Sequence, residues 1–326
     1  MNAFEYVNPS NIEEVPALLG KGRDREAVIM AGGTDLLGEL KDNLAAPERL
    51  VNLKALPDLS YVRHERNEVK IGATTRLTEI VTDKKIRASY TALAQAAESV
   101  ASLQIRNVGT IGGNLCQRPR CWYYRGETFH CLKKGGHMCY AVDGNNKHHA
   151  IMGGGPCFMV HPSDTAPALI ALDAKVRVEG PNGPRELSVE DFFVLPDEKL
   201  QQETVLKPDE VVTEVALPTP KPGTESAYLK FKEKGSMDFA VSAVAVAIRV
   251  EKGVCRSARV VLGGVAPKPW RSAEAERVLV GQGVTEDLAA KAAEAALTEA
   301  EPLKDNAYKV PLTQVLIQRA VMAAVA

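Results

Sequence analysis

The sequence predicts an α+β protein, and three observations support this fold class. Near the N-terminus, a buried strand at Ala27–Met30, a helix at roughly Leu36–Asn43 and a second strand at Arg49–Leu53 form a β-α-β unit. Farther along, Leu59–Arg63 and Glu68–Gly72 alternate between apolar and polar residues, as two antiparallel strands do. The last third contains three strand patterns and then three helical patterns, which is typical of a sheet covered by helices.

Size and composition limit the possible classes of function. The chain has 326 residues, enough for two or three domains, with 45% hydrophobic and 25% charged residues, as in soluble globular proteins. A formal net charge of −1 argues against nucleic acid or a membrane surface as a partner. We find no run of the roughly 18 apolar residues that a membrane span needs. The start, Met1–Tyr6, has no signal-peptide pattern. We therefore expect a cytoplasmic protein, or a periplasmic one if it is exported with a signal-bearing partner.

A glycine pair follows the first strand directly, in Ala31-Gly32-Gly33-Thr34-Asp35-Leu36. Glycine permits positive φ and lets a ligand approach the backbone closely. Successive N–H groups in such a turn form an anion-binding nest, and the helix that follows directs its N-terminus to the same place. The pattern is consistent with a diphosphate site, although most single glycine pairs are only tight turns.

A second glycine pair lies in Thr110-Ile111-Gly112-Gly113-Asn114. Two such loops are more specific than one, because a dinucleotide has two phosphates and two ends to hold. Neither loop fits the GxGxxG fingerprint or the phosphate-binding loop with its Lys-Ser/Thr. We therefore predict a nucleotide held outside a Rossmann pocket.

The remaining elements are predicted from apolar periodicity and turn residues. A helix is expected over Ile86–Ser102, a strand at Lys175–Glu179, a short helix at Leu187–Phe193 and a strand at Glu210–Leu217. A proline-rich break follows at 218–223, and we place the main domain boundary there. The last third then has three strands, followed by three helices with Ser272 and Thr285 as N-caps: Ser226–Lys232, Ala240–Val250 and Ala258–Leu262, then Ser272–Leu279, Glu286–Thr298 and Pro311–Val325.

Cysteine and histidine are concentrated between Thr110 and Asp164, which contains five of the six residues of each kind. Four of these cysteines, separated by 9, 7 and 17 residues and without a CxxC pair, are Cys121, Cys131, Cys139 and Cys157. In a reducing compartment such a group favours metal ligation over disulfides. The surrounding segment is basic and aromatic, which suits an anionic iron–sulfur cluster. Zinc at the same thiolates, or cysteines without a metal, stay open at this point.

Four motifs together resemble the FAD-binding medium subunit of the molybdenum hydroxylases, the family of xanthine, carbon monoxide and aldehyde dehydrogenases. They are Ala31–Leu36, Thr110–Asn114, His161-Pro162-Ser163-Asp164 and Gly263–Arg271. The resemblance covers nearly the whole chain. The cysteine insertion is similar to the branch that contains the FAD subunits of 4-hydroxybenzoyl-CoA reductase and periplasmic aldehyde oxidoreductase, whose members carry an extra [4Fe–4S] cluster.

The resemblance implies a two-subdomain FAD module of the vanillyl-alcohol-oxidase type and a third, C-terminal domain like that of carbon monoxide dehydrogenase flavoproteins. The domains would span 1–55, 56–222 with the iron–sulfur insertion at 115–160, and 223–326. It also implies the residues around FAD: Ala27, Val28, Ile29, Met30, Ala31, Gly32, Gly33, Thr34, Asp35, Leu36, Val100, Thr110, Gly113, Asn114, Asp164, Val211 and Lys230. Of these, Asp164 would contact the adenosine or ribityl region and Lys230 would lie close to the flavin ring. The cluster ligands would be Cys121, Cys131, Cys139 and Cys157, because Cys121 follows an arginine as in that branch.

The function implied is electron transfer without a catalytic side chain. A large molybdenum-cofactor subunit would oxidise an aldehyde or N-heterocycle, and a small subunit with two [2Fe–2S] clusters would relay electrons to this FAD. The acceptor would be oxygen, a quinone, NAD or ferredoxin. Two other classes are weighed against this one. A self-contained flavoenzyme would turn over substrate alone, and a zinc-stabilised scaffold or nucleic-acid module would contain no flavin.

Overall fold

The computed structural model describes residues 1–20, 26–235 and 237–326. The first sheet is small and parallel, with the order β1-β3-β2. Its strands are β1 (Glu5–Val7), β2 (Ala27–Met30) and β3 (Arg49–Asn52). Two helices cover it, α1 (Val15–Leu19) and α2 (Leu36–Lys41), and β2-α2-β3 is the β-α-β unit that the sequence predicts. The sequence did not predict β1, which has only three residues.

The second sheet is antiparallel and mixes strands from distant parts of the chain, in the order β4-β5-β8-β6-β7. These strands are β4 (Val62–His64), β5 (Glu68–Gly72), β6 (Lys175–Glu179), β7 (Arg185–Ser188) and β8 (Val211–Pro218). Because β8 pairs with both β5 and β6, it joins the parts of the chain before and after the cysteine insertion. The segment predicted as one helix at Leu187–Phe193 contains the end of β7 and only a short α10 (Val189–Phe192).

Helices that pack against the second and third sheets build the main hydrophobic core. They are α3 (Leu77–Thr82), α4 (Lys84–Ser89), α5 (Thr91–Ser99), α7 (Ile111–Leu115) and the fully buried α9 (Thr165–Ala171). The short α6 (Leu103–Arg106) has no buried residue. The prediction of a single helix over Ile86–Ser102 was wrong, because the chain leaves helical geometry at Tyr90 (φ −132°, ψ 51°) and again at Val100. The apolar stripe is nevertheless core, since Ile86, Leu93 and Ala97 are fully buried.

The third sheet is antiparallel, and three helices cover one of its faces. Its order is β12-β11-β10-β9, formed by β9 (Thr224–Phe231), β10 (Ser242–Glu251), β11 (Val254–Gly263) and β12 (Trp270–Arg271). The helices are α11 (Ala273–Leu279), α12 (Glu286–Ala295) and α13 (Lys309–Ala323), and Ser272 and Thr285 cap two of them as predicted. The sequence predicted three strands and the structure has four, because Trp270 and Arg271 pair with β11 at the sheet edge.

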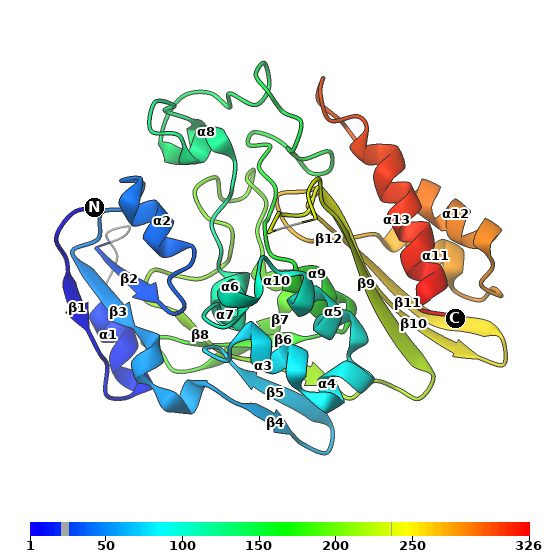
Figure 1. Cartoon of the computed structure of the whole chain (residues 1–326), viewed down its shortest axis with the longest axis horizontal. Helices are drawn as coiled ribbons and strands as arrows, with labels where there is room; N and C mark the ends of the chain where they lie inside the picture. The colour runs from blue at the N-terminus through cyan, green and yellow to red at the C-terminus, as the bar shows by residue number, and fades with distance from the viewer. Residues whose placement is uncertain (21–25, 236) are drawn as a thin grey trace.

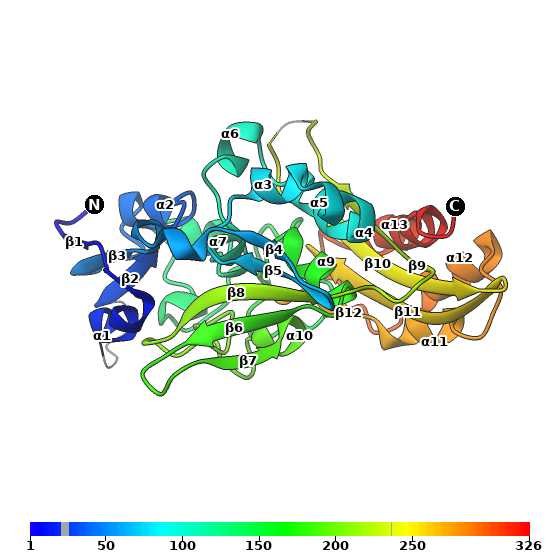
Figure 2. The same ribbon diagram turned by 90° about the horizontal axis from the view of Figure 1, so that it is seen from below.

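The three sheets lie side by side along the molecule, with the first sheet and the C-terminal helices at opposite ends (Figures 1 and 2). The cysteine insertion forms loops on one side of the molecule and contains only α8 (Trp122–Arg125) and the short 3-10 turn η4 (Leu132–Lys134) (Figure 1). The other 3-10 turns are η1 (Ile12–Glu14), η2 (Leu53–Ala55) and η3 (Pro57–Leu59). None of the helices in the described residues is both long and apolar enough to cross a bilayer. The domain boundaries at 55/56 and 222/223 stay predictions.

Candidate functional site

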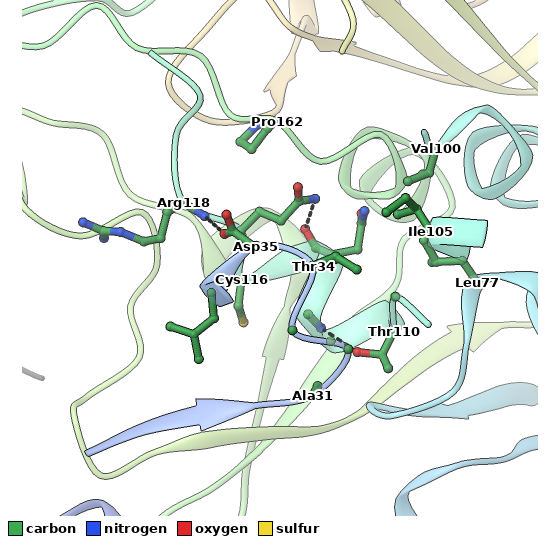
Figure 3. Close-up of a pocket in the computed structure, with 18 of the residues that line it drawn as sticks. Ala31, Thr34, Asp35, Leu77, Val100, Ile105, Thr110, Cys116, Arg118 and Pro162 are labelled. Carbon is green, nitrogen blue, oxygen red and sulfur yellow. Dashed lines mark hydrogen bonds between the residues drawn. The ribbon is translucent and has the colours of Figure 1, made fainter. Parts of the chain in front are cut away.

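A cavity of about 590 Å³ opens where the first sheet, the second sheet and the loop between β9 and β10 meet. Both glycine-pair turns lie on its wall, and Figure 3 shows Ala31, Thr34 and Asp35 of the first turn opposite Thr110 of the second. One part of the wall is apolar and comes from α3, the end of α5 and α6, with Leu77, Val100 and Ile105 (Figure 3). Another part carries charge and is formed by Arg120, Asp164 and Asp238.

The glycines are required because backbone packs against backbone at the two turns. A Cβ on Gly32 would lie 2.5 Å from the carbonyl oxygen of Val108, so no side chain fits between the turns. A Cβ on Gly112 would lie 2.9 Å from the carbonyl oxygen of Ala73, in the connection that follows β5. Gly33 adopts a φ of +73°, which glycine reaches without strain. The two motifs therefore form one structural unit.

The first turn presents backbone donors that the protein does not use. The N–H groups of Gly32, Gly33 and Thr34 find no acceptor within the described chain. In the second turn, the Thr110 hydroxyl accepts a hydrogen bond from the Gly113 N–H at 3.2 Å and so fixes the start of α7. Free N–H groups in a turn of this shape bind anions such as a diphosphate. The first turn fits the diphosphate of a dinucleotide.

Asn114 connects the second turn to the loop that carries Asp164. Its side-chain oxygen accepts hydrogen bonds from the hydroxyls of Ser163 and Thr165, both at 2.6 Å. Asp164 is buried and accepts hydrogen bonds from the Tyr228 hydroxyl and the Lys230 ammonium, both at 2.7 Å. Burial raises the pKa of Asp164, and the adjacent Lys230 opposes that rise. The predicted residues Asn114 and Asp164 thus lie on a hydrogen-bonded wall, and Lys230 supports it from behind through Asp164.

Neighbouring His161 contributes no charge to this wall. It is fully enclosed, its ring contacts Phe193, and burial lowers its pKa to about 3. Its Nδ1 accepts a hydrogen bond from the Ser163 N–H at 3.3 Å. The neutral imidazole therefore shapes the loop and does not act as an acid near pH 7.

Asp35 has a different environment from the one expected of a residue that contacts FAD phosphates. One of its carboxylate oxygens accepts a hydrogen bond from the Arg118 N–H at 2.7 Å (Figure 3), and the other pairs with Arg120 at 2.7 Å and Arg125 at 2.8 Å. All three donors belong to the cysteine insertion. The carboxylate therefore attaches the insertion to the first glycine turn, and the two guanidinium groups offset its charge beside the anion-binding N–H groups.

Most of the residues predicted to surround FAD lie on the cavity wall. They are Val28, Ile29, Ala31, Gly32, Gly33, Thr34, Asp35, Leu36, Val100, Thr110, Gly113, Asn114, Asp164 and Val211. Ala27, Met30 and Lys230 do not line it, although Lys230 pairs with Asp164. The sequence did not point to the wall residues Leu77, Ile105, Cys116, Arg118, Arg120 and Phe239. The two arginines carried a signal, since they follow the second glycine turn within a few residues.

Cys116 is the one cysteine that opens onto the cavity. The residue is exposed toward the cavity, and desolvation by the surrounding protein atoms raises the pKa of its thiol to about 12. The thiol is therefore protonated near neutral pH, which separates Cys116 from the four cysteines of the insertion that were predicted as ligands.

Those four thiols lie near one another. The thiols of Cys139 and Cys157 interact directly, and this interaction lowers the pKa of Cys139 to about 6 and raises that of Cys157. The charges of Cys139 and Cys131 both act on Cys121, whose pKa rises to about 11 mainly through burial. Across the described ranges, no three His, Cys, Asp or Glu side chains converge as the ligands of a single ion. The four thiols therefore form a loose group.

Backbone amides lie close to three of these sulfurs and act to lower the pKa of the thiols. They belong to Tyr123 and Tyr124 at Cys121, to Ala141, Val142 and Phe158 at Cys139, and to Met159 at Cys157. The rings of Tyr123, Phe129 and Tyr140 contact each other beside them. His149 places Nε2 3.2 Å from the Cys121 sulfur, and burial lowers its pKa to about 4. The backbone amides thus favour negative charge on sulfur, whereas burial of Cys121 and Cys157 opposes it.

Buried ion pairs hold the insertion to the rest of the protein. Glu203, on the loop before β8, is 5% exposed and pairs with Arg118 and with the ammonium of Lys133, the latter at 2.7 Å. Glu39 of α2 is also buried and accepts a hydrogen bond from the Tyr124 hydroxyl at 2.8 Å. The insertion is therefore anchored to both the first and the second sheet.

The C-terminal domain holds the other end of the insertion through residues 304–309, which we call the C-terminal clamp. The Asn306 amide donates to the carbonyls of His149 and Ala150, and the Asp305 N–H donates to the Asn146 side chain. The ammonium of Lys309 is fully buried and donates to the carbonyls of His148, His149 and Gly264 at 3.3, 3.0 and 2.6 Å. The insertion is therefore held by the parts of the chain that carry the first, second and third sheets.

Comparison with known proteins gives concordant results. Residues 2–220 match the family described as FAD binding domain in molybdopterin dehydrogenase, and residues 226–324 match the CO dehydrogenase flavoprotein C-terminal domain. The chain is 34% identical over 319 residues to the aldehyde oxidoreductase FAD-binding subunit PaoB of Escherichia coli, covering 96% of each protein. It is 31% identical over 327 residues to the carbon monoxide dehydrogenase medium chain of Hydrogenophaga pseudoflava, covering 98% of this chain and 96% of that one.

Solved structures show the same likeness in three dimensions. A carbon monoxide dehydrogenase from Hydrogenophaga pseudoflava superposes with a TM-score of 0.80 at 30% identity, covering 99% of this chain and 97% of that one. A reconstituted CO dehydrogenase from Oligotropha carboxidovorans superposes with a TM-score of 0.78 at 27% identity, with 99% and 98% covered. The mixed α/β fold and the antiparallel C-terminal sheet that the sequence predicts are therefore those of these flavoprotein subunits.

Proposed function

The chain belongs to the family of FAD-binding medium subunits of molybdopterin dehydrogenases, and from this premise we propose that it is the FAD- and [4Fe–4S]-containing electron-transfer subunit of a heterotrimeric molybdenum hydroxylase. Its relatives are oxidoreductase subunits of molybdenum-dependent dehydrogenases, so it is an enzyme subunit. The two-subdomain FAD module of the vanillyl-alcohol-oxidase type is part of the proposal.

The single observation that carries the FAD proposal is the cavity with its two packed glycine turns. The free N–H groups of Gly32, Gly33 and Thr34 would hold the diphosphate, and Asn114 and Asp164 would contact the sugar or ribityl chain. Bound FAD supplies one- and two-electron redox chemistry, which the protein's dipoles and charges tune. The polar groups of the wall fit electron transfer better than acid–base catalysis, because His161 is neutral and Asp164 is already paired.

The [4Fe–4S] proposal rests on the chemistry of the four thiols at Cys121, Cys131, Cys139 and Cys157. Backbone amides close to the sulfurs, with Lys133 close to Cys157, are features that would stabilise an anionic cluster. Zinc at the same four thiolates is the alternative, and metal analysis distinguishes it from the cluster.

The partners follow from the same reading. We infer a large subunit with the molybdenum cofactor, which oxidises an aldehyde or an N-heterocycle, and a small subunit with two [2Fe–2S] clusters that passes electrons to this FAD. The acceptor is oxygen, a quinone, NAD or ferredoxin. A cytoplasmic location, or a periplasmic one after export with a signal-bearing partner, belongs to this proposal. Similar subunits belong to carbon monoxide, nicotinate and caffeine dehydrogenases and to an aldehyde oxidoreductase, so the substrate varies within the family.

Metal and flavin analysis of anaerobically purified protein tests the proposal. We expect one FAD and about four iron atoms per chain, with flavin bands above a broad thiolate-to-iron absorption. Cys139→Ser should lose the iron and keep the flavin, whereas Cys255→Ser, at a buried cysteine outside the insertion, should keep both. Flavin without iron, with substrate turnover by the isolated chain, would instead identify a self-contained flavoenzyme. A colourless zinc protein would overturn both readings.

A further inference from the structure

Arg120 stands at the point where the cysteine insertion meets the cavity. It lines the cavity, and the next residue is Cys121, the first proposed cluster ligand. Its side chain is 25% exposed and makes one ion pair, to Asp35. It also donates hydrogen bonds to the Arg118 carbonyl and to the Gln117 side chain, the latter at 3.2 Å. The guanidinium group is therefore fixed in position at the cavity wall.

An aromatic ring completes this environment. The guanidinium carbon of Arg120 lies 5.0 Å from the centre of the Phe239 ring, within the range of a cation–π contact. Phe239 also lines the cavity, on the loop between β9 and β10. The insertion and the C-terminal domain thus meet across Arg120 and hold its charge toward the cavity.

The charge of Arg120 is only partly compensated. Asp35 is its one carboxylate partner in the described chain, and the same oxygen of Asp35 also pairs with Arg125. Arg125 has a second carboxylate, Glu39, at 3.9 Å. Arg118, the other arginine on the cavity wall, pairs with Glu203 and, at 3.8 Å, with Glu39. Within the described residues Arg120 is thus the arginine of this group that depends on Asp35 alone, and it shares that carboxylate.

Two parts of the cavity wall differ in chemistry, and they suit different parts of a flavin dinucleotide. Leu77, Val100 and Ile105 form an apolar part, which suits a neutral adenine. Arg120, Asp164 and Phe239 lie together around a small adjoining cavity and form a charged part, which we call the charged end. The flavin ring has a polar edge, and this edge gains negative charge when the ring is reduced. We therefore assign the charged end to the flavin ring.

We propose that Arg120 sets the reduction potential of the bound flavin, by stabilising the negative charge that reduced flavin carries and oxidised flavin lacks. This inference rests on the proposed FAD-binding function. Arg120 would act on the flavin through its charge, from the cavity wall, and would not donate or accept a proton. Arginine suits this task because its charge does not titrate in the physiological range.

The test measures the flavin midpoint potential in the assembled complex by anaerobic dye titration. Arg120→Gln and Arg120→Met both remove the charge, one with a polar and one with an apolar side chain. Either variant that retains FAD should lower the affinity for reduced flavin, relative to oxidised flavin, by at least tenfold. This corresponds to about 30 mV for a two-electron couple. Arg120→Lys keeps the charge and should stay within threefold of the wild type.

Arg125→Gln is the matched control, because it removes the second guanidinium from Asp35 but its side chain is not on the cavity wall. It should stay within threefold. An unchanged potential in flavin-loaded Arg120→Gln or Arg120→Met would overturn the inference. So would an equal shift in Arg120→Lys or in Arg125→Gln, because the effect would then be structural or unspecific. Wild-type protein without FAD would instead refute the proposed function, and flavin content separates the two failures.

Discussion

The FAD cavity and the cysteine insertion lie side by side but are held together by different forces. At the cavity, backbone packs on backbone, and Gly32 and Gly112 are required because a single added carbon would collide with a carbonyl oxygen. The insertion has little regular structure, and buried charges on other parts of the chain hold it, above all Asp35, Glu39 and Glu203. The cavity therefore depends on shape, and the insertion depends on charge pairing.

This difference predicts how each region fails. A steric change at the cavity should displace the two glycine turns and reduce FAD binding while leaving the insertion's ion pairs in place. The loss of one buried charge should release the insertion, because the groups left behind are unpaired charges away from water. The two regions share Asp35, so damage should pass between them chiefly through that residue.

The largest effect is expected at Glu203. Glu203→Ala leaves the ammonium of Lys133, whose side chain is 1% exposed, without its carboxylate, and leaves Arg118 only the longer pair to Glu39 at 3.8 Å. Breaking a buried ion pair from one side costs about 3–5 kcal/mol. We expect a loss of this size in the free energy of unfolding, measured by denaturant titration, together with loss of iron from the purified protein.

Glu186→Ala is the control for this prediction. Glu186 pairs with Lys175 at 2.7 Å, but both side chains are more than half exposed, and such pairs contribute about 0–1 kcal/mol. If the two variants were equally stable, charge pairing would not be what holds the insertion, and the contrast between the two regions would fail.

A smaller effect on stability, with a larger one on FAD, is expected at Gly32. Gly32→Ala places a methyl group against the Val108 carbonyl, and such overpacking costs about 1–3 kcal/mol. Because the two turns must separate to admit the methyl group, FAD affinity should fall by at least about tenfold, or roughly 1.4 kcal/mol. Flavin fluorescence during dilution of the loaded protein measures this loss.

Gly235→Ala is a suitable comparison, since a Cβ there meets nothing within 4 Å and the backbone φ is not positive. It should bind FAD as the wild type does. Iron content provides the second readout, because Gly32→Ala should keep its iron if the cavity and the insertion fail separately. Loss of iron in this variant would show that the two regions form one cooperative unit.

The same contrast explains which parts could be predicted from the sequence. The β2-α2-β3 unit and the capped C-terminal helices follow from local periodicity and local capping residues, so they were predictable. The glycine turns were also recognisable, because backbone contact requires glycine itself. The break at Tyr90 and the edge strand at Trp270 depend on tertiary contacts that a short window of sequence does not contain.

The insertion's anchors could not be predicted for a different reason. Glu203 lies 70 residues beyond Lys133 in the sequence, and nothing near it distinguishes it from a surface glutamate. Asp35 was predicted as a cofactor-binding residue because it belongs to the first glycine motif. In the structure its carboxylate pairs with the insertion, which only the folded arrangement of Arg118, Arg120 and Arg125 reveals.

The smallest expected effect is at Lys309 of the C-terminal clamp, which tests how a buried amine behaves without a carboxylate partner. Its ammonium has three carbonyl acceptors but no carboxylate, and burial lowers its pKa to about 7 from 10.5. Between these values the unfolded chain holds a proton that the folded chain has released. The free energy of unfolding should therefore rise with pH between about 7 and 10.5, by on the order of 1 kcal/mol per unit from this group, and stay level below pH 7.

Lys309→Met should abolish that rise, and the measurement is the difference in unfolding free energy between variant and wild type at pH 6, 7, 8 and 9. Lys304→Met is the control, because Lys304 donates to the Asp143 carbonyl at 2.8 Å from an exposed position and should leave the slope intact. The three carbonyls oppose the effect of burial on the pKa of Lys309. They match the three N–H groups of an ammonium, whereas a neutral amine has only two. Equal slopes in wild type and Lys309→Met would mean that these acceptors keep Lys309 charged in the folded protein. Lys309 would then be a buried charge stabilised by its hydrogen-bond partners, as Lys133 is by Glu203. It would not be a neutral amine that is held by packing alone.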